Sequence, residues 1–187
     1  REFDLPVVPR GAGTGLSGGA IPSEGGIVVA FTRMDRILDV DRRDRRALVE
    51  PGVVNDRLTT AAAKHGLYYA PDPSSQRICT LGGNVAENSG GAHCLAHGTT
   101  TNYVLGLEVA LADGGVVWLG SDSGDAAGYD LRGAVVGSEG TLGIVTSIAL
   151  RLRRTPEAVR TLLAAFTGVR AAGEAVTEII AAGILPV

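Results

Sequence analysis

The loop at residues 10–19 has the composition of an anion-binding backbone. It reads RGAGTGLSGG, with five glycines in the nine residues after Arg10. Glycine lacks a Cβ and reaches positive φ, so successive N–H groups can approach a diphosphate closely, and Arg10 could add positive charge. A long glycine run costs conformational entropy unless its shape is used, which favours a binding loop over an ordinary flexible turn.

Three known motifs overlap this loop or share its chemistry, and the sequence context argues against each. Residues 13–18 match G-x-G-x-x-G, yet a Rossmann loop must open a helix, whereas Pro22 and the pair Gly25-Gly26 follow here. The missing helix also removes the nucleophile elbow from the G-x-S-x-G match at 15–19, which disfavours Ser17 as a nucleophile. A P-loop is excluded because the only lysine, Lys64, precedes a histidine.

Three further segments combine glycine or proline with polar side chains. Residues 71–75 read PDPSS, and residues 80–91 read TLGGNVAENSGG, in which two glycine pairs flank Asn84 and Asn88. An amide both donates and accepts, so these side chains could position a polar ring edge or brace the loop itself. Residues 137–145, GSEGTLGIV, again run from a glycine-rich loop into a strand. Three glycine-rich loops in one domain indicate binding more strongly than any one of them.

The possible metal ligands do not have the spacing of a metal site. His93, Cys94 and His97 lie within five residues, but zinc needs four ligands, or three and a water, and no second Cys/His pair is near. A later acidic stretch lacks the spacing of a calcium-binding loop and indicates solvated charge. We therefore predict no metal site. The acidic residues are Asp122, Asp125 and Asp130.

The composition excludes several classes of protein. The chain has 187 residues, of which 17 are basic and 20 acidic, so a net charge of −3 offers no basic surplus for nucleic acid. No run approaches the ~18 apolar residues of a membrane-spanning helix, and no secretory signal is present, which predicts a cytoplasmic protein. Cys79 and Cys94 form neither a CxxC pair nor a disulfide framework, which a reducing compartment allows.

The elements that position these loops follow from apolar runs and turn residues. β-branched runs predict strands at 7–8, 27–31, 37–40, 47–49 and 144–152. The turn Asp113-Gly114-Gly115 predicts a hairpin between strands at 104–112 and 116–119. Asn55 is expected to cap a helix that ends near Gly66. Helices are also predicted at 159–166, after Pro156, and at 172–180, ending at Gly183. The chain lacks an initial Met and stops where a new strand is expected, so we interpret it as a fragment.

Taken in order, five motifs resemble the FAD-binding domain of the vanillyl-alcohol-oxidase/p-cresol-methylhydroxylase superfamily. Within it the chain is similar to the FAD subunit of bacterial glycolate oxidases and to D-lactate and D-2-hydroxyglutarate dehydrogenases. The resemblance implies an α+β fold, with an FAD-binding domain of two α/β subdomains at 1–152 and the start of a ferredoxin-like substrate domain at 153–187. The motifs are PRGAGTGLSGGA, PDPSS, TLGGNVAENSGG, HGTTTNYVLGLEVALADG and GSEGTLGIVTSIALRL.

The resemblance also implies which residues contact the cofactor. Thr14 stands where some members carry a histidine bonded to the flavin, which implies non-covalent FAD. The implied contacts to the pyrophosphate are Arg10, Gly11, Ala12, Gly13, Thr14, Gly15, Leu16 and Ser17; those to the ribityl chain and flavin are Pro71, Asp72, Pro73, Thr80, Gly82, Gly83, Asn84, Asn88, Gly90, Gly91, His97 and Gly98; and those to the adenine and ribose are Glu139, Gly143, Ile144 and Val145.

The activity implied by the resemblance is oxidation of a 2-hydroxy acid of the glycolate or D-lactate type. Hydride would pass to flavin N5 while a base beyond Val187 takes the hydroxyl proton, so no catalytic residue is assigned within this chain. The electron acceptor is left open among partner iron–sulfur subunits, a quinone, a cytochrome and oxygen. Two alternatives remain: another substrate, such as a sugar, a lactone, an alditol or an enolpyruvyl nucleotide, or a non-catalytic nucleotide-binding module.

Overall fold

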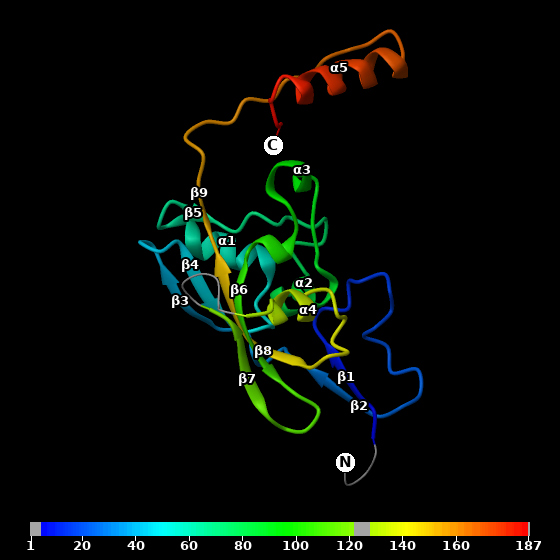
Figure 1. Cartoon of the computed structure of the whole chain (residues 1–187), viewed down its shortest axis with the longest axis vertical. Coiled ribbons are helices and arrows are strands. Elements are labelled where there is room, and N and C mark those ends of the chain that lie inside the picture. The colour runs from blue at the N-terminus through cyan, green and yellow to red at the C-terminus, as the bar shows by residue number, and fades with distance from the viewer. Residues whose placement is uncertain (1–4, 122–127, 187) are drawn as a thin grey trace.

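A five-stranded antiparallel sheet organises most of the chain, of which the computed structural model describes residues 5–121 and 128–186 (Figure 1). The central strand of this sheet, at residues 144–151, has two neighbouring strands on each side, and most of its second half is buried. The predicted strands and hairpin are confirmed, and Gly114 adopts the positive φ of +87° that this turn needs. In spatial order the strands are β3 (Ile37–Asp41), β4 (Arg46–Val49), β8 (Ile144–Arg151), β6 (Val104–Ala110) and β7 (Val116–Gly120).

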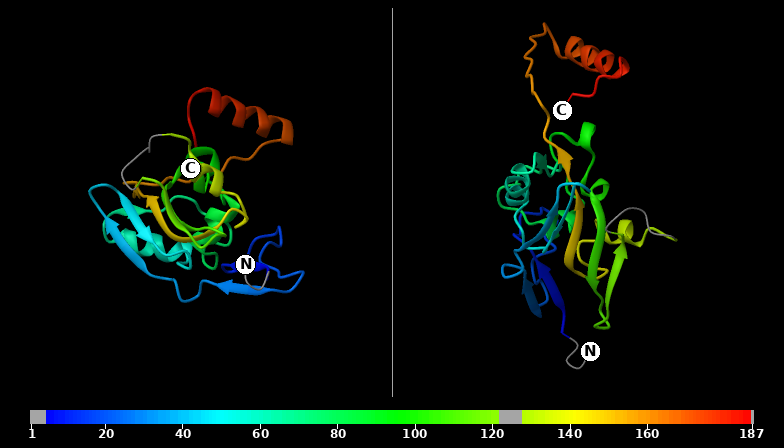
Figure 2. Two further views of the ribbon diagram at one scale, coloured as in Figure 1. Left: turned by 60° about the horizontal axis from the view of Figure 1, so that its bottom comes forward. Right: turned by 90° about the vertical axis from the view of Figure 1, so that its left-hand side faces the viewer.

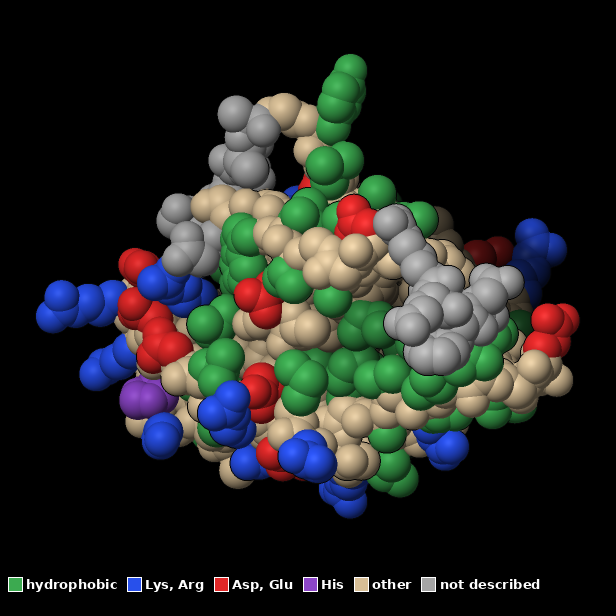
Figure 3. Space-filling view, turned by 90° about the horizontal axis from the view of Figure 1, so that it is seen from below, with side chains coloured by type: hydrophobic (Ala, Val, Ile, Leu, Met, Phe, Trp, Pro, Cys, Tyr) green, Lys and Arg blue, Asp and Glu red, His purple; other side chains and the backbone are tan. Residues whose placement is uncertain are grey.

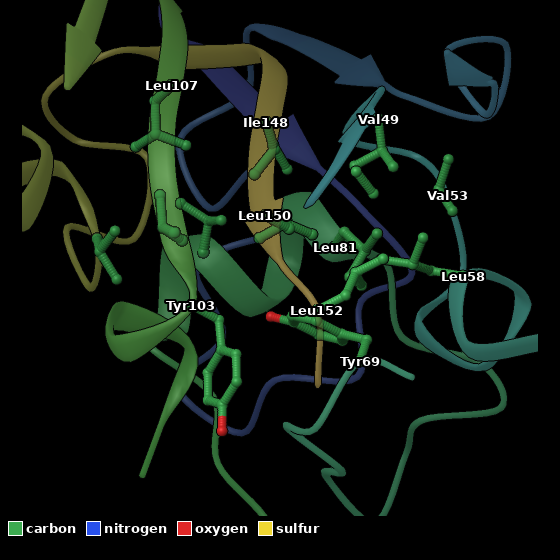
Figure 4. Close-up of a cluster of buried hydrophobic side chains, with 14 of the residues drawn as sticks. Val49, Val53, Leu58, Tyr69, Leu81, Tyr103, Leu107, Ile148, Leu150 and Leu152 are labelled. Carbon is green, nitrogen blue, oxygen red and sulfur yellow. The ribbon is translucent and has the colours of Figure 1, made fainter. Parts of the chain in front are cut away.

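Helices α1 (Asn55–Ala63) and α2 (Leu81–Glu87) bury their apolar faces against this sheet. Leu58 and Leu81 from these helices lie with Leu107, Ile148 and Leu150 from the strands in one apolar cluster, and each of these side chains is almost fully buried (Figure 4). Burial of large side chains at this density is the main source of stability in a domain of this size. The core therefore holds α2 firmly in place.

The expected cap of α1 is wrong. Val54, not Asn55, is the residue that precedes the helix, and the helix has no side-chain cap. Asn55 is instead buried, and its Nδ2 donates a hydrogen bond of 3.0 Å to the carbonyl oxygen of Pro71. The helix ends as predicted, because Gly66 adopts a left-handed φ of +69° shortly after its last turn. Asn55 thus ties the segment at 71–75 to the core.

A second, smaller unit lies beside the main sheet and carries the first glycine-rich loop. Strands β1 (Val7–Arg10) and β2 (Ile27–Ala30) pair in parallel, and residues 11–26 connect them. The side chains of Val7 and Ile27 are half exposed on this unit. Figure 3 shows hydrophobic side chains spread over the end of the molecule that carries it. The α+β class is therefore observed, with the five-stranded antiparallel sheet, this parallel pair and one further antiparallel pair of short strands at 67–68 and 153–154.

Short elements complete the part of the chain that the structure describes. The glycine-rich segment at 80–88, which we expected to be a loop, forms α2, and three further short helices follow it. None of the helices in the described ranges is long and apolar enough to cross a membrane. The remaining elements are β5 (Leu67–Tyr68), α3 (Cys94–His97), η1 (Thr100–Asn102), α4 (Leu131–Val135), β9 (Arg153–Arg154) and α5 (Val169–Ala181).

The chain leaves the main sheet at Leu152 and ends in α5, which stands clear of the sheet in both views of Figure 2. The helix predicted at 172–180 is confirmed, but the one predicted at 159–166 is wrong. Leu162 and Leu163 are 92% and 100% exposed, so nothing in the described part of the chain packs against these two side chains. Leu185 and Pro186 are not in the strand that was expected to begin at 185–187, and Val187 lies outside the described residues. The domain boundary at 152/153 stays a prediction.

Candidate functional site

A cleft of about 400 Å³ lies between the first glycine-rich loop and the surface formed by α2 and the start of β8. All three glycine-rich segments contribute to its walls, although they are about 60 residues apart along the chain. The expected site residues that line it are Gly11, Ala12, Gly13, Thr14, Gly15, Leu16, Ser17, Thr80, Gly82, Gly83, Asn84, Glu139, Gly143, Ile144 and Val145.

The loop at 11–17 presents unused hydrogen-bond donors to this cleft. None of its backbone N–H groups donates to a backbone or side-chain acceptor among the described residues. Gly13 has a φ of +70°, a conformation that strains any residue with a Cβ. Gly11 and Ala12 are half-buried and residues 13–17 are exposed, so these N–H groups are free to bind an acceptor such as a phosphate in the cleft.

Close approaches fix this loop against α2. A Cβ added to Gly11 would lie 2.3 Å from Oγ1 of Thr80, which is the N-cap residue of α2. The same Oγ1 accepts a hydrogen bond of 3.3 Å from the N–H of Gly83. At the other edge of the cleft, a Cβ on Gly140 would lie 2.7 Å from Cγ of Pro9. The small residues are therefore required by packing as well as by backbone conformation.

The two asparagines that we singled out have different roles. Asn84 lines the cleft, is 1% exposed, and its Nδ2 has no oxygen or nitrogen acceptor among the described residues. It interacts with the thiol of Cys79, which is a weak acceptor, and burial raises the pKa of that thiol. Asn88 does not line the cleft: it ends α2 with a left-handed φ of +48°, and its Oδ1 accepts from the N–H of Thr101. Asn84 is thus a buried donor in the wall of the cleft without an oxygen or nitrogen acceptor, whereas Asn88 braces the loop.

The charges around the cleft are acidic rather than basic. Among the described residues that line it, Glu87 and Glu139 are charged and none is Lys, Arg or His. Arg10 does not line it, but its guanidinium lies near the backbone of Gly13. An anion in this cleft would therefore be held by backbone N–H groups, while carboxylates suit ligand hydroxyl groups. These donors, acceptors and glycine-lined walls fit a nucleotide with a diphosphate and sugar hydroxyls.

Several expected site residues lie outside the cleft, in a polar cluster formed by β5, α3 and β9. Arg153 donates to Nδ1 of His97 at 3.0 Å, so neutral His97 carries its proton on Nε2 and donates to the Tyr68 hydroxyl at 3.3 Å. Burial and the charge of Arg153 lower the pKa of His97. Asp72 accepts from Nδ1 of His93 at 2.5 Å. The expected residues that do not line the cleft are Arg10, Pro71, Asp72, Pro73, Asn88, Gly90, Gly91, His97 and Gly98.

The possible metal ligands each contact a different partner. His93 bonds Asp72, His97 bonds Arg153, and the Cys94 sulfur accepts from the N–H of Gly91 at 2.9 Å. Among the described residues, no group of three His, Cys, Asp or Glu side chains is arranged to hold a metal ion. Of the acidic stretch, Asp130 is the N-cap of α4 and pairs with Arg132. Asp122 and Asp125 lie outside the described residues.

Sequence reasoning missed Glu87, Ser75 and Cys79, which also line the cleft. Glu87 lies three residues after Asn84 on α2, so the two share a face of that helix. The spacing of Asn84 and Glu87 indicates a shared face only if the segment at 80–88 is a helix. The two adjacent glycines of this segment argue against a helix. Ser75 ends the PDPSS motif but was not among the expected contacts, and Cys79 has no distinctive pattern around it.

Comparison with known proteins places this geometry among flavin-binding domains. A family model described as FAD binding domain matches residues 1–120. The chain is 52% identical over 182 residues to the glycolate oxidase subunit GlcD of Escherichia coli K12, covering 97% of this chain and 36% of that protein. It is 40% identical over 163 residues to the D-lactate dehydrogenase of Anaerostipes hadrus, covering 87% of this chain and 34% of that one.

The comparison with solved structures agrees at the level of the fold. A structure of alkyldihydroxyacetonephosphate synthase superposes with a TM-score of 0.81 at 26% identity, over 97% of this chain and 36% of that one. The chain thus spans about a third of the length of the proteins that it matches.

Proposed function

The chain belongs to the FAD binding domain family, so FAD is its cofactor, and we propose that the cleft holds FAD without a covalent bond. The observation that carries this proposal is the convergence of three glycine-rich segments around N–H groups of residues 11–17 that have no partner. Thr14, in the middle of this loop, offers a hydroxyl group and no ring nitrogen for a bond to flavin.

Each wall of the cleft has a distinct role in this proposal. The N–H groups of residues 11–17 bind the diphosphate, and the lack of Lys, Arg and His among the described residues of the lining supports this role. Asn84 donates its unpaired Nδ2 hydrogens to a polar edge of the cofactor, which satisfies a donor that is otherwise buried without an acceptor. The stretch that contains Glu139 and residues 143–145 lies along the adenine and ribose, where a carboxylate accepts from a sugar hydroxyl.

For the whole protein, the proposed activity is the oxidation of a 2-hydroxy acid of the glycolate or D-lactate type. When bound, FAD supplies the acceptor for the hydride of the α-carbon. Two relatives named for glycolate and D-lactate, at 52% and 40% identity, support this substrate class. The residues from 153 onward begin the substrate domain in this proposal, and the base that takes the hydroxyl proton lies outside this chain. In this proposal, partner subunits or a quinone accept the electrons from the reduced FAD, and the whole protein is located in the cytoplasm.

Absorbance spectroscopy tests the cofactor proposal directly. We expect the purified protein to keep a flavin spectrum after incubation with FAD and desalting, and to release the yellow colour into the supernatant when acid precipitates the protein. Colour in the pellet would refute a non-covalent bond. A colourless protein that retains another nucleotide would support the non-catalytic module instead.

A matched pair of glycine variants tests the location of the site. Gly13→Ala and Gly114→Ala both place a Cβ at a positive φ, +70° and +87°, so both carry a similar backbone strain of about 1–2 kcal/mol. Only Gly13 lines the cleft, whereas Gly114 lies in the β6–β7 turn. We expect Gly13→Ala to lose FAD on desalting and Gly114→Ala to retain it. Equal retention by both variants would remove the loop from the proposed site.

A further inference from the structure

We infer that Glu87 is a positioning residue for the cofactor loop at residues 11–17, which it holds against α2 by accepting a hydrogen bond from Ser17; this inference rests on the proposed binding of FAD in the cleft. Oγ of Ser17 donates to Oε2 of Glu87 at 2.9 Å, across 70 residues of sequence. Within residues 11–17, no other side-chain hydrogen bond is present among the described residues.

The loop contacts α2 near both ends of that helix. Gly11 meets Thr80 at the N-cap, and a Cβ on Gly15 would lie 2.8 Å from Oε1 of Glu87 in the last turn. The seven residues of α2 are about 10 Å long, and the four peptide units from Gly11 to Gly15 reach about 14 Å at full extension. The loop must therefore run along the helix, and Glu87 marks the point where its far end is attached.

A loop so rich in glycine needs such an attachment to keep its N–H groups convergent. Glycine has more backbone freedom to lose than any other residue, so an untied loop disperses its donors among many conformations. The side chain at the tip, Leu16, is fully exposed and gives the loop no anchor in the core. The Ser17 hydroxyl hydrogen is engaged by Glu87, whereas the Ser17 N–H has no acceptor among the described residues. Glu87 thus acts on the cofactor through the loop.

The charge of Glu87 opposes its positioning role, and this opposition makes the inference testable. A carboxylate near a diphosphate repels it, so charge alone predicts that removal of Glu87 strengthens FAD binding. Positioning predicts the opposite. Glu87→Gln separates the two effects, because the amide oxygen can still accept from Ser17 while the negative charge is lost.

The experiment measures the FAD dissociation constant of the purified protein by flavin fluorescence for Glu87→Ala, Ser17→Ala, the double variant and Glu87→Gln. The two alanine variants are expected to weaken binding by a similar factor, roughly 3- to 10-fold for one exposed hydrogen bond, and the double variant no more than either single one. Glu87→Gln is expected to bind within about 3-fold of the wild type or more tightly. Glu178→Ala on α5, a carboxylate remote from the cleft, is the control and should bind as the wild type does.

Each outcome has a separate meaning. Tighter binding by Glu87→Ala, or multiplicative losses in the double variant, overturns the positioning role while leaving the proposed cofactor intact. A wild-type protein that does not bind FAD overturns the proposed function and the inference with it. Urea unfolding of every variant separates a positioning role from a loss of stability. A positioning role requires that the FAD affinity changes while the urea unfolding midpoint of the variant equals that of the Glu178→Ala control.

Discussion

Gly11 and Thr80 provide the sharpest test of how the cofactor loop is packed. In Gly11→Ala the new Cβ would lie 2.3 Å from Oγ1 of Thr80, closer than a carbon and an oxygen atom approach without a bond. If Thr80 rotates away, it loses its cap bond to Gly83, which costs about 1 kcal/mol. If the backbone moves instead, overpacking costs about 1–3 kcal/mol. We therefore expect Gly11→Ala to lower the free energy of unfolding by about 1–3 kcal/mol.

The same substitution should be harmless once Oγ1 is absent. In a Thr80→Ala background the nearest remaining atoms are Cβ of residue 80 at 3.6 Å and the nitrogen of Gly83 at 3.8 Å, which are ordinary contacts. The φ of Gly11 is outside the left-handed region, so alanine there reduces the entropy of the unfolded chain and stabilises by about 0.4–1 kcal/mol. The effect of Gly11→Ala should change sign between the two backgrounds, with a coupling energy of about 1.5–4 kcal/mol.

Urea unfolding of the four proteins in this cycle measures the coupling. The single tryptophan, Trp118 in β7, reports unfolding of the main sheet by fluorescence. Gly168→Ala is the control, since its backbone is extended and nothing lies within 4 Å of the added Cβ. Additive effects, within about 0.5 kcal/mol, would show that the loop does not press on the cap of α2, and the packing account of the cleft would then be wrong.

Three further predictions concern ionisation and the core. Burial and Arg153 lower the pKa of His97, so the unfolded chain takes up a proton below pH ~6.5 before the folded chain does. The free energy of unfolding therefore falls as the pH drops through that range. Arg153→Met should raise the pKa of His97 in an NMR titration and lessen this fall. Hydrogen bonds from Arg36 lower the pKa of Glu50, so their stabilisation is present above pH 4.5 and is lost as the pH falls through the lowered pKa. Arg36→Met should therefore lower the urea midpoint at pH 7 and have a smaller effect in acid. Leu107→Ala, at a fully buried position, should cost about 2–5 kcal/mol in the same assay.

Local chemistry was enough to predict much of the main sheet. The β6–β7 hairpin follows from Asp113-Gly114-Gly115, because the turn needs a positive φ that glycine adopts without strain, and Asp113 accepts from the N–H of Gly115. The left-handed Gly66 after α1 was predictable for the same reason. The glycine-rich loops were recognisable as binding segments because a free glycine backbone is costly without a use.

Helices that depend on packing were predicted poorly. The segment TLGGNVAE contains two adjacent glycines, each of which disfavours a helix by about 1 kcal/mol, yet it forms α2. Leu81 and Val85 anchor it in the core, and Gly82 is required because a Cβ there would lie 2.6 Å from Cβ of Pro51. Conversely, the apolar spacing at 159–166 predicted a helix that the structure does not contain, although α5, which has no buried residue either, does form.

The sequence by itself determined the family, the glycine-rich loops and the strands, since these depend on residue types and on conformations that each residue adopts locally. Only the tertiary structure decided which expected site residues share a cleft. It brought Thr80 and Asn84 into the wall and left Asp72 and His97 in a separate polar cluster. It also paired Ser17 with Glu87 across 70 residues, because contacts between distant segments depend on how the sheet and helices pack and not on any neighbouring residue.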